Sequence, residues 1–278
     1  MQRPSAEEQK ARIRWLYNTT ADHFDDPPLN FWNTCGARSV DVAGIRPGQT
    51  VLDVCCGTGA SAIPAAERVG KAGRVIGVDF AENLLELARA KAKERALDNV
   101  EFVPGDMTAL TLPDQSFDVV NCVFGIFFAP DMAGALLGLW RKVRPGGRIV
   151  LTVWGERVLE PGGTIFWDAV DTIRPDLRPK VSPWERLTTP AGLAALFSEA
   201  GLPEPGIVAE SLHSPASPDD FWRIVLGTGL RGTVEQMKAD ETALLRRTIE
   251  ARLEAEQVQE IVSDVLYATA QLQRPELG

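Results

Sequence analysis

The sequence predicts an α/β protein built around a doubly wound parallel sheet. Apolar strand-like segments alternate with helix-like segments between residues 50 and 154, which is typical of repeated β-α-β units. A glycine-rich turn follows the first strand, within the segment VLDVCCGTGASAIPAA at residues 51–66. Glycine permits the sharp turn and the close backbone approach that a bound ligand needs. Such a turn is expected at the carboxyl edge of the sheet, where open α/β sheets bind their ligands.

The elements of the core follow one another at short intervals. Apolar runs predict the strands, and leucine and alanine residues at helical spacing predict the helices between them. The predicted strands cover residues 51–54, 74–80, 99–103, 117–124 and 148–154. The predicted helices begin at Ala60 or cover residues 82–96 and 132–143, with two more ahead of the core at 5–21 and 34–44. Phe24 to Trp32, which contains two prolines, is predicted to be a loop.

The regular alternation lapses after Gly155. Residues 155–187 are predicted to form an irregular loop with one short helix at 165–173. Thr189 and Pro190 are a good N-cap and first-turn pair for a helix that ends at Gly201. The remaining predictions are a sixth strand at 207–213, a helical stretch at 218–255 and a final strand at 258–272.

Composition argues against several classes of partner. The net charge of −9 disfavours a nucleic-acid substrate, which requires a basic binding surface. No apolar run approaches the roughly 20 residues of a membrane span, and Met1 to Lys10 is too polar for a signal peptide. The four cysteines lack zinc-type spacing, and a disulfide framework is not expected. We therefore expect a cytoplasmic protein without metal, membrane or nucleic-acid partners, as a monomer or a homodimer.

The glycine turn is compatible with two kinds of cofactor. Residues 57–62 fit the pattern G-x-G-x-x-A, and Asp79 lies twenty residues beyond Gly59, as in dinucleotide-binding proteins. A nicotinamide-dependent dehydrogenase is therefore one hypothesis. Asp53 argues against it, because a carboxylate four residues ahead of Gly57 would repel a pyrophosphate. The same carboxylate suits the ammonium and sulfonium groups of S-adenosylmethionine, which carries no phosphate.

Two further acidic residues follow later strands. Asp79 ends the second strand, where its carboxylate would accept hydrogen bonds from ribose hydroxyls. Asp106 follows the third strand and would accept a hydrogen bond from the adenine amine, with Met107 beside the ring. The carboxyl ends of parallel strands meet at one edge of the sheet. Asp53, Asp79 and Asp106 together therefore predict a site for S-adenosylmethionine and its product S-adenosylhomocysteine.

Five segments carry a resemblance to a known family. They are DVCCGTG (53–59), GVDFAENLLELARAKA (77–92), GDM (105–107), FDVVNCVFGIFFAPD (117–131) and VRPGGRIVLTVW (143–154). In these segments the chain resembles the class I S-adenosylmethionine-dependent methyltransferases, near the ubiquinone/menaquinone C-methyltransferases and related small-molecule enzymes. Cys55 departs from the glycine that the family often has there, although small residues are also accepted.

The resemblance implies a Rossmann-like sheet of seven strands whose last strand is antiparallel. Four parts are then expected: an N-terminal helical lid (1–44), a cofactor-binding core (45–217), a helical insertion or cap (218–257), and the final strand and tail (258–278). The residues expected to contact the cofactor are Asp53, Cys55, Gly57, Gly59, Asp79, Phe80, Asp106, Met107, Cys122 and, as part of the lid, Tyr17.

The sequence gives weaker signals for the residues that would bind the methyl acceptor. Several aromatic residues are either core or an apolar wall for a small, apolar or aromatic acceptor. They are Phe31, Trp32, Phe124, Phe127, Phe128 and Trp154. The only two histidines, His23 and His213, are candidate general bases.

The chemistry itself leaves the acceptor atom open. Methyl transfer requires mainly that the two reactants are aligned and that water is excluded. No metal is expected, and oxygen, nitrogen and carbon all remain acceptor atoms. A protein that keeps the cofactor without transferring a methyl group is the second hypothesis.

Overall fold

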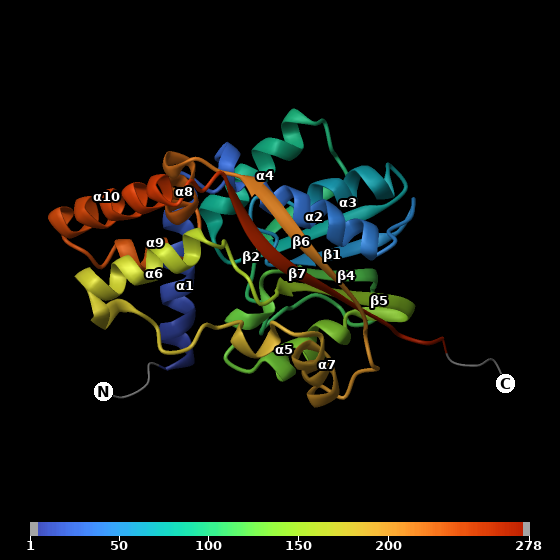
Figure 1. Ribbon diagram of the computed structural model, residues 1–278. Helices are drawn as coiled ribbons and strands as arrows, with labels where there is room; N and C mark the ends of the chain where they lie inside the picture. Colours follow the sequence, from blue (N-terminus) through green and yellow to red (C-terminus); the bar gives the residue numbers. More distant parts are fainter. Residues whose placement is uncertain (1–4, 275–278) are drawn as a thin grey trace.

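A seven-stranded sheet runs through the centre of the molecule (Figure 1). The computed structural model describes residues 5–274. The strands are β1 (Thr50–Val54), β2 (Arg74–Asp79), β3 (Val100–Pro104), β4 (Phe117–Val123), β5 (Val143–Trp154), β6 (Gly206–Pro215) and β7 (Glu260–Gln271). The outer parts of the predicted lid and tail, residues 1–4 and 275–278, lie outside the described residues.

The strand order is β3-β2-β1-β4-β5-β7-β6. β1 pairs in parallel with β2 on one side and β4 on the other, so the order reverses at this strand. β7 is antiparallel to both of its neighbours, β5 and β6. The prediction of a doubly wound, seven-stranded sheet with an antiparallel last strand is confirmed. The reversal at β1 opens a crevice at the carboxyl ends of the strands, where this class of sheet binds ligands.

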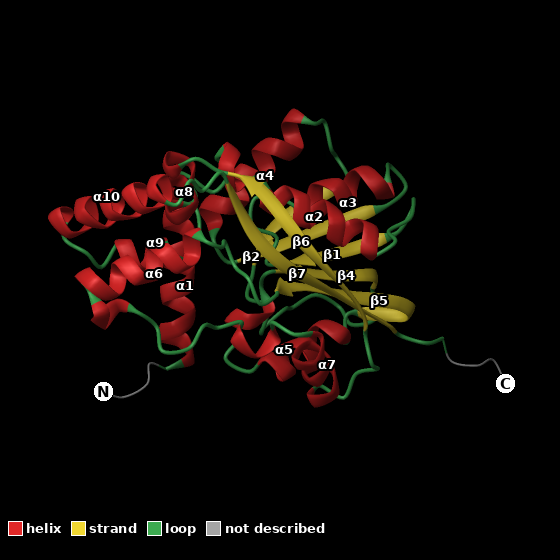
Figure 2. Ribbon diagram, viewed as in Figure 1, coloured by secondary structure: helices red, strands yellow, loops and turns green. Residues whose placement is uncertain are grey.

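Helices cover both faces of the sheet, and this is why its central strands are almost wholly apolar. The helices are α1 (Ala6–Thr20), α2 (Phe31–Val42), α3 (Ala62–Val69), α4 (Glu82–Glu94), α5 (Met132–Trp140), α6 (Gly162–Ile173), α7 (Pro190–Glu199), α8 (Pro218–Leu226), α9 (Arg231–Val234) and α10 (Ala239–Ala255). Figure 2 shows α2 and α3 on one side of the sheet and α5 and α7 on the other. Val51 and Leu52 of β1 are therefore completely buried.

A second group of helices gathers at one end of the sheet. α1, α6, α8, α9 and α10 lie together on the left of Figure 1. α10 packs against α6 and α8, and α1 contacts α4 and α9. The predicted helical stretch at 218–255 therefore exists between β6 and β7, but it is divided into three helices. The first break contains Gly227 and Gly229, which are poor helix formers.

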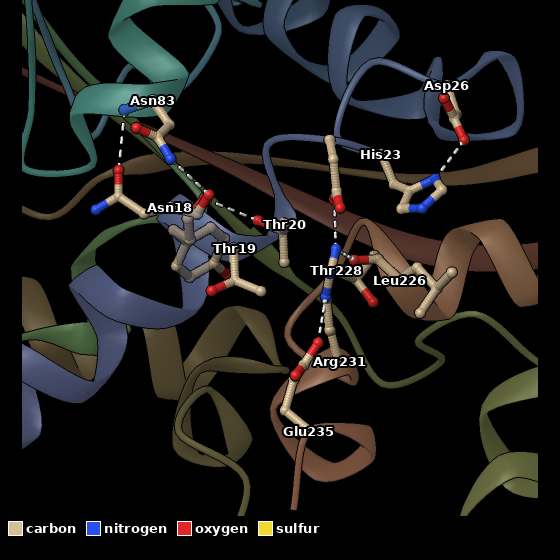
Figure 3. Close-up of polar contacts among 12 residues, drawn as sticks. Asn18, Thr19, Thr20, His23, Asp26, Asn83, Leu226, Thr228, Arg231 and Glu235 are labelled. Carbon is tan, nitrogen blue, oxygen red and sulfur yellow. Dashed lines mark hydrogen bonds and ion pairs between the residues drawn. The ribbon is translucent and has the colours of Figure 1, made fainter. Parts of the chain in front are cut away.

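Polar contacts fix the N-terminal helix in its place (Figure 3). Asn83, at the start of α4, donates its backbone N–H to Asn18 Oδ1 at 2.9 Å and its side-chain amide to Asn18 O at 3.0 Å. Arg231 of α9 pairs with Asp22 and donates to Glu235 Oε1 at 2.9 Å. The C-terminal end of α1 and the segment after it are thus tied to two separate parts of the chain.

Two sequence predictions about element boundaries were wrong. α2 begins at Phe31, inside the predicted loop, and a 3-10 turn at Pro27–Leu29 precedes it. The prolines initiate this turn because their fixed φ suits a first helical position. β5 begins at Val143 rather than at residue 148, because the pairing with β4 resumes across a bulge between Phe117 and Val119. The glycine-rich segment before Arg148 is therefore part of a bulged strand.

Gly36 tests the close packing of α2 on the glycine-turn segment. A Cβ at this position would lie 2.3 Å from Ala60 O, a backbone atom that has no room to move. We expect Gly36→Ala to lower the free energy of unfolding by about 1–3 kcal/mol. Gly138→Ala is the matched control, because a Cβ there has no neighbour within 4 Å. It should be neutral or stabilising by up to about 1 kcal/mol in urea unfolding. Equal effects for the two variants would contradict this packing.

Candidate active site

A deep cavity lies at the carboxyl ends of the central strands. It comprises about 840 Å³ of space, part of which is open to solvent, and its lining is mainly apolar. Residues of α1, of the turn after β1 and of the segments after β2, β3 and β4 form its walls. The predicted cofactor residues in this lining are Tyr17, Cys55, Gly57, Asp79, Phe80, Asp106 and Met107.

The backbone of the turn after β1 adopts positive φ angles at several residues, and part of this turn faces the cavity. Cys55, Gly57 and Gly59 all have positive φ, at 58°, 52° and 86°. A side chain at Gly57 would lie 3.7 Å from the ring of Phe24, so glycine leaves this part of the cavity open. Gly59 lies beneath the turn instead, where a Cβ would lie 3.0 Å from Ile63. The glycine spacing therefore serves two purposes, an open cavity at Gly57 and close packing at Gly59.

Asp79 connects this turn to the end of β2. Its Oδ2 accepts the backbone N–H of Gly57 at 2.9 Å, and its Oδ1 accepts that of Ala81 at 2.9 Å. Burial raises the pKa of Asp79, and the backbone hydrogen bonds oppose that shift. Each carboxylate oxygen has a second lone pair. The carboxylate is therefore held in a fixed position at the cavity wall and can still accept hydrogen bonds from two hydroxyl groups.

Asp53 was predicted to face the ligand, but it does not line the cavity. Its side chain is buried under the turn, where Ser61 Oγ donates to it at 2.7 Å and Asn121 Nδ2 donates at 3.1 Å. Ser39 Oγ donates in turn to Asn121 Oδ1 at 2.7 Å. Asp53 thus belongs to a buried polar chain that joins β1, β4 and α2. Cys122, another predicted contact, is also fully buried and lies outside the cavity lining.

Asp106 is held from the side of α1. Lys10 Nζ lies 2.8 Å from Asp106 Oδ2 and donates to Thr108 Oγ1 at 2.8 Å. Burial alone would raise the pKa of Asp106, but the hydrogen bonds from Lys10 and Thr108 outweigh it and lower the pKa. This charge pair therefore holds the N-terminal half of α1 in place over the cavity. Lys10 carried no signal in the sequence, because a lysine on an amphipathic helix is usually a solvated surface residue.

Aromatic rings form a large part of the cavity wall. Trp32, Phe124 and Phe128 line the cavity as predicted, and Phe24 joins them, stacked on Trp32 with ring centroids 5.4 Å apart. Tyr17 packs edge-on against Phe128 at 5.4 Å. The other predicted acceptor residues are Phe31, Phe127 and Trp154, which are buried outside this lining. Trp154 stacks behind Phe124 at 4.0 Å and so holds its ring in place.

One polar atom of this wall has no partner. The indole nitrogen of Trp32 is buried and makes no hydrogen bond within the described residues. A buried N–H without an acceptor costs roughly 1–3 kcal/mol.

The two histidines, predicted as candidate general bases, do not line the cavity. His23 Nδ1 lies 2.9 Å from Asp26 Oδ2 and does not line the cavity (Figure 3). His213 is exposed on the edge strand β6, with its Nδ1 3.1 Å from Glu260 Oε1. The His213 pair is exposed, whereas the His23 pair is partly buried and directly precedes Phe24, which does line the cavity. A sequence alone does not distinguish a histidine that acts as a base from one that does not, because the difference lies in the surroundings of the side chain.

A three-residue network connects the N-terminal segment to the glycine turn. Lys91 Nζ of α4 lies 2.6 Å from Asp25 Oδ1 and donates to Thr58 Oγ1 at 2.8 Å. Thr58 Oγ1 donates to Asp25 Oδ1 at 2.8 Å. Burial lowers the pKa of Lys91, and Asp25 opposes that shift. The network places Phe24, the neighbour of Asp25, against Gly57.

Asp53 should make stability depend on pH. Burial raises its pKa from 3.8 to about 7, so between about pH 4 and pH 7 the folded protein binds more protons here than the unfolded chain. The wild type therefore loses stability as the pH rises through this window. The Asp53→Asn side chain is uncharged at every pH. Across this window its free energy of unfolding should therefore rise by up to about 4 kcal/mol relative to that of the wild type. Urea unfolding at a series of pH values measures this difference, and parallel curves for the two proteins would contradict it.

The Lys91–Asp25 pair should be energetically coupled. In a double-mutant cycle with Lys91→Met and Asp25→Asn, we expect a coupling energy of about 1–3 kcal/mol in urea unfolding. The double variant should therefore be more stable than the sum of the single effects implies. Lys93→Met is the control, because Lys93 is exposed on the same helix. A coupling energy near zero would mean that the pair does not hold the N-terminal segment.

The strand order, with a glycine turn and a cavity at the carboxyl edge, is the architecture of the class I S-adenosylmethionine-dependent methyltransferases. An S-adenosylmethionine-dependent methyltransferase from Aquifex aeolicus has this fold, with a TM-score of 0.54 and 17% identity over 91% of this chain and 98% of that chain. A phosphoethanolamine N-methyltransferase of Haemonchus contortus, solved with S-adenosylhomocysteine, superposes with a TM-score of 0.56 and 16% identity over 98% of this chain and 61% of that chain.

Residues 29–160 match the ubiE/COQ5 methyltransferase family. A demethylmenaquinone methyltransferase of Lactococcus lactis subsp. lactis (strain IL1403) is 44% identical over 146 residues, which are 50% of this chain and 57% of that protein. The predicted resemblance is thus confirmed. The chain spans little more than half the length of this curated relative. Among residues 5–274, none of the helices is long and apolar enough to cross a bilayer, and no cluster of metal-ligating side chains is found.

Proposed function

We propose that this protein transfers the methyl group of S-adenosylmethionine to a small apolar or aromatic acceptor. The observation that carries the proposal is the carboxylate of Asp79, held at the cavity wall by Gly57 and Ala81 with its remaining lone pairs available. The match to the ubiE/COQ5 family supports it, and the relatives named demethylmenaquinone methyltransferase favour a quinone-type ring as the acceptor class.

The residues of the cavity fit the cofactor in charge and shape. Asp79 would bind the ribose hydroxyls, and Asp106 with Met107 would bind the adenine. Gly57 leaves space for the amino-acid part beside Phe24. Apart from Lys10, which Asp106 neutralises, the described lining contains no cationic side chain. The site therefore suits a cationic ligand without phosphate groups better than a dinucleotide.

The protein contributes position and a dry environment rather than a histidine base. When bound, S-adenosylmethionine supplies an electrophilic methyl group. Phe124 and Phe128, after β4, would hold the acceptor ring against it, and Tyr17 would close the cavity from α1. Alignment of two reactants accounts for about 7–11 kcal/mol of a barrier in favourable cases. We infer that α1 and the segment through Asn30 act as the lid, and that α8–α10 support it from the other side.

Methyl transfer is tested directly with labelled S-adenosylmethionine and a panel of quinols, phenols and amines. Transfer of label to any acceptor in the panel supports the proposal. Tight binding of S-adenosylhomocysteine with no transfer to any of them would favour the cofactor-retaining alternative. Binding of NADH without binding of S-adenosylhomocysteine in calorimetry would overturn the proposal.

Asp79→Ala should weaken cofactor binding while the protein stays folded. A hydrogen bond to a charged group contributes about 1.5–3 kcal/mol, so we expect the Kd of S-adenosylhomocysteine to rise about 10-fold to 100-fold. Asp98→Ala is the matched control, since Asp98 is exposed and lies outside the cavity lining. Far-UV circular dichroism checks the fold. An unchanged Kd in the folded Asp79→Ala variant would show that the ribose is bound elsewhere.

A further inference from the structure

Two cysteine side chains meet beside the cavity and take no part in the proposed reaction. Cys122 of β4 lies opposite Val54 in the register of β1 and β4, and Cys55 directly follows Val54. Residues of a strand alternate between its two faces. The positive φ of Cys55 ends that alternation, and its side chain packs in the same apolar cluster as Cys122. Both cysteines are free thiols, so together they form a dithiol.

Gly125 brings a third segment against both sulfur atoms. A Cβ at this position would lie 2.6 Å from Cys55 Sγ and 3.0 Å from Cys122 Sγ. Only glycine lets the backbone approach both side chains so closely. Hydrogen bonding with Cys122, together with burial, raises the pKa of the Cys55 thiol. The Cys55 thiol therefore stays protonated at neutral pH, with a second sulfur atom as its neighbour.

The cavity gives access to this pair from one side. Cys55 lines the cavity together with Gly57, Asp79 and Gly125, whereas Cys122 is completely buried outside the lining. A reagent in the cavity would therefore meet Cys55 first and then the sulfur atom of Cys122 next to it. A cofactor bound at Asp79 would occupy the same part of the cavity.

Cys56 is adjacent to Cys55 in sequence but packs differently. A Cβ at Gly77 of β2 would lie 3.0 Å from Cys56 Sγ. Cys56 also belongs to a separate apolar cluster, the one that contains Phe102, although it borders the cavity as well. The sulfur atom that shares the surroundings of Cys55 is thus the one from β4, which is remote in sequence.

A protonated dithiol favours a particular kind of chemistry. Alkylating and oxidising reagents attack the thiolate, which the raised pKa of Cys55 disfavours. A trivalent arsenic oxide, R–As=O, instead condenses with two thiols. Two As–S bonds form, the bonds between arsenic and oxygen break, and the oxygen leaves as one water molecule with both thiol protons. Arsenic stays trivalent, so no oxidant or reductant is needed, and because its third bond is to carbon, two sulfur ligands are sufficient.

We propose that Cys55 and Cys122 form a dithiol site that binds an aryl-substituted trivalent arsenical in competition with the cofactor. Sulfur is a soft ligand and prefers soft centres such as trivalent arsenic. The aryl group would lie in the cavity, where Trp32 and Phe124 supply apolar surface. The site goes beyond methyl transfer, because it requires neither a methyl donor nor an acceptor. Only the competition rests on the proposed function.

The test titrates phenylarsine oxide into the full-length, reduced protein. Native intact-mass spectrometry counts the bound groups, and proteolysis followed by peptide mapping locates them. We expect one phenylarsenic group per chain, which bridges the peptide containing Cys55 to the peptide containing Cys122. A bridge between Cys55 and Cys56 within one peptide, or no tight binding, would overturn the proposal.

Single substitutions measure the contribution of each sulfur atom. Cys55→Ala and Cys122→Ala should each raise the Kd of phenylarsine oxide about 100-fold or more, because the second contact is then lost from an otherwise intramolecular pair. Cys56→Ala is the matched control, since it removes the adjacent thiol and should keep the wild-type Kd. Far-UV circular dichroism checks the fold. A wild-type Kd in folded Cys122→Ala would contradict the pairing, and the peptide bridge in the wild type decides the question if a variant does not fold.

Competition with S-adenosylhomocysteine separates this site from the proposed function. When S-adenosylhomocysteine is present at about 100 times its own Kd, the apparent Kd of phenylarsine oxide should rise about 100-fold. An unchanged Kd with S-adenosylhomocysteine bound would place the arsenical outside the cofactor cavity and overturn the proposal. An intact peptide bridge in a protein that does not bind S-adenosylhomocysteine would support the dithiol site and count against the proposed function alone.

Discussion

The hydrogen bonds of Asp79 are the interactions on which the site depends. One carboxylate accepts backbone N–H groups from Gly57 and from Ala81, so it joins the turn after β1 to the segment that begins α4. Hydrogen bonds in a buried, low-dielectric environment are electrostatically stronger than those in water. The floor of the cavity therefore forms one rigid unit, and the aromatic wall and α1 pack against a surface that this unit defines.

The two aspartates that flank the glycine turn illustrate how environment separates similar residues. Asp79 lines the cavity, and its two oxygens accept backbone N–H groups from Gly57 and Ala81. Asp53 lies under the turn, where the hydroxyl of Ser61 and the amide of Asn121 engage it. The first is positioned to meet a ligand and the second supports the turn from beneath. The two side chains are chemically identical, and they differ only in how deeply each is buried in the fold.

Much of the core could be predicted from the sequence, whereas the contacts made at a distance could not. The apolar runs and the glycine turn define β1, β2 and β4 because local patterning determines these elements. The turn also indicated Gly57 and Asp79 as cavity residues. Asp53 was misplaced because strand position does not reveal which side of the turn a side chain occupies. Lys10, Asp25 and Lys91 carried no local signal, since their partners are brought together only by tertiary packing.

The fastening of α1 has a consequence for the kinetics of ligand exchange. The helix is held near its start by Lys10 and near its end by Asn18, with the following segment tied to Arg231. A ligand that leaves past α1 must wait until these separate contacts open together. Cooperative local opening of this kind is slow compared with the motion of a free loop. The residence time of a bound ligand would then depend on residues that never touch it.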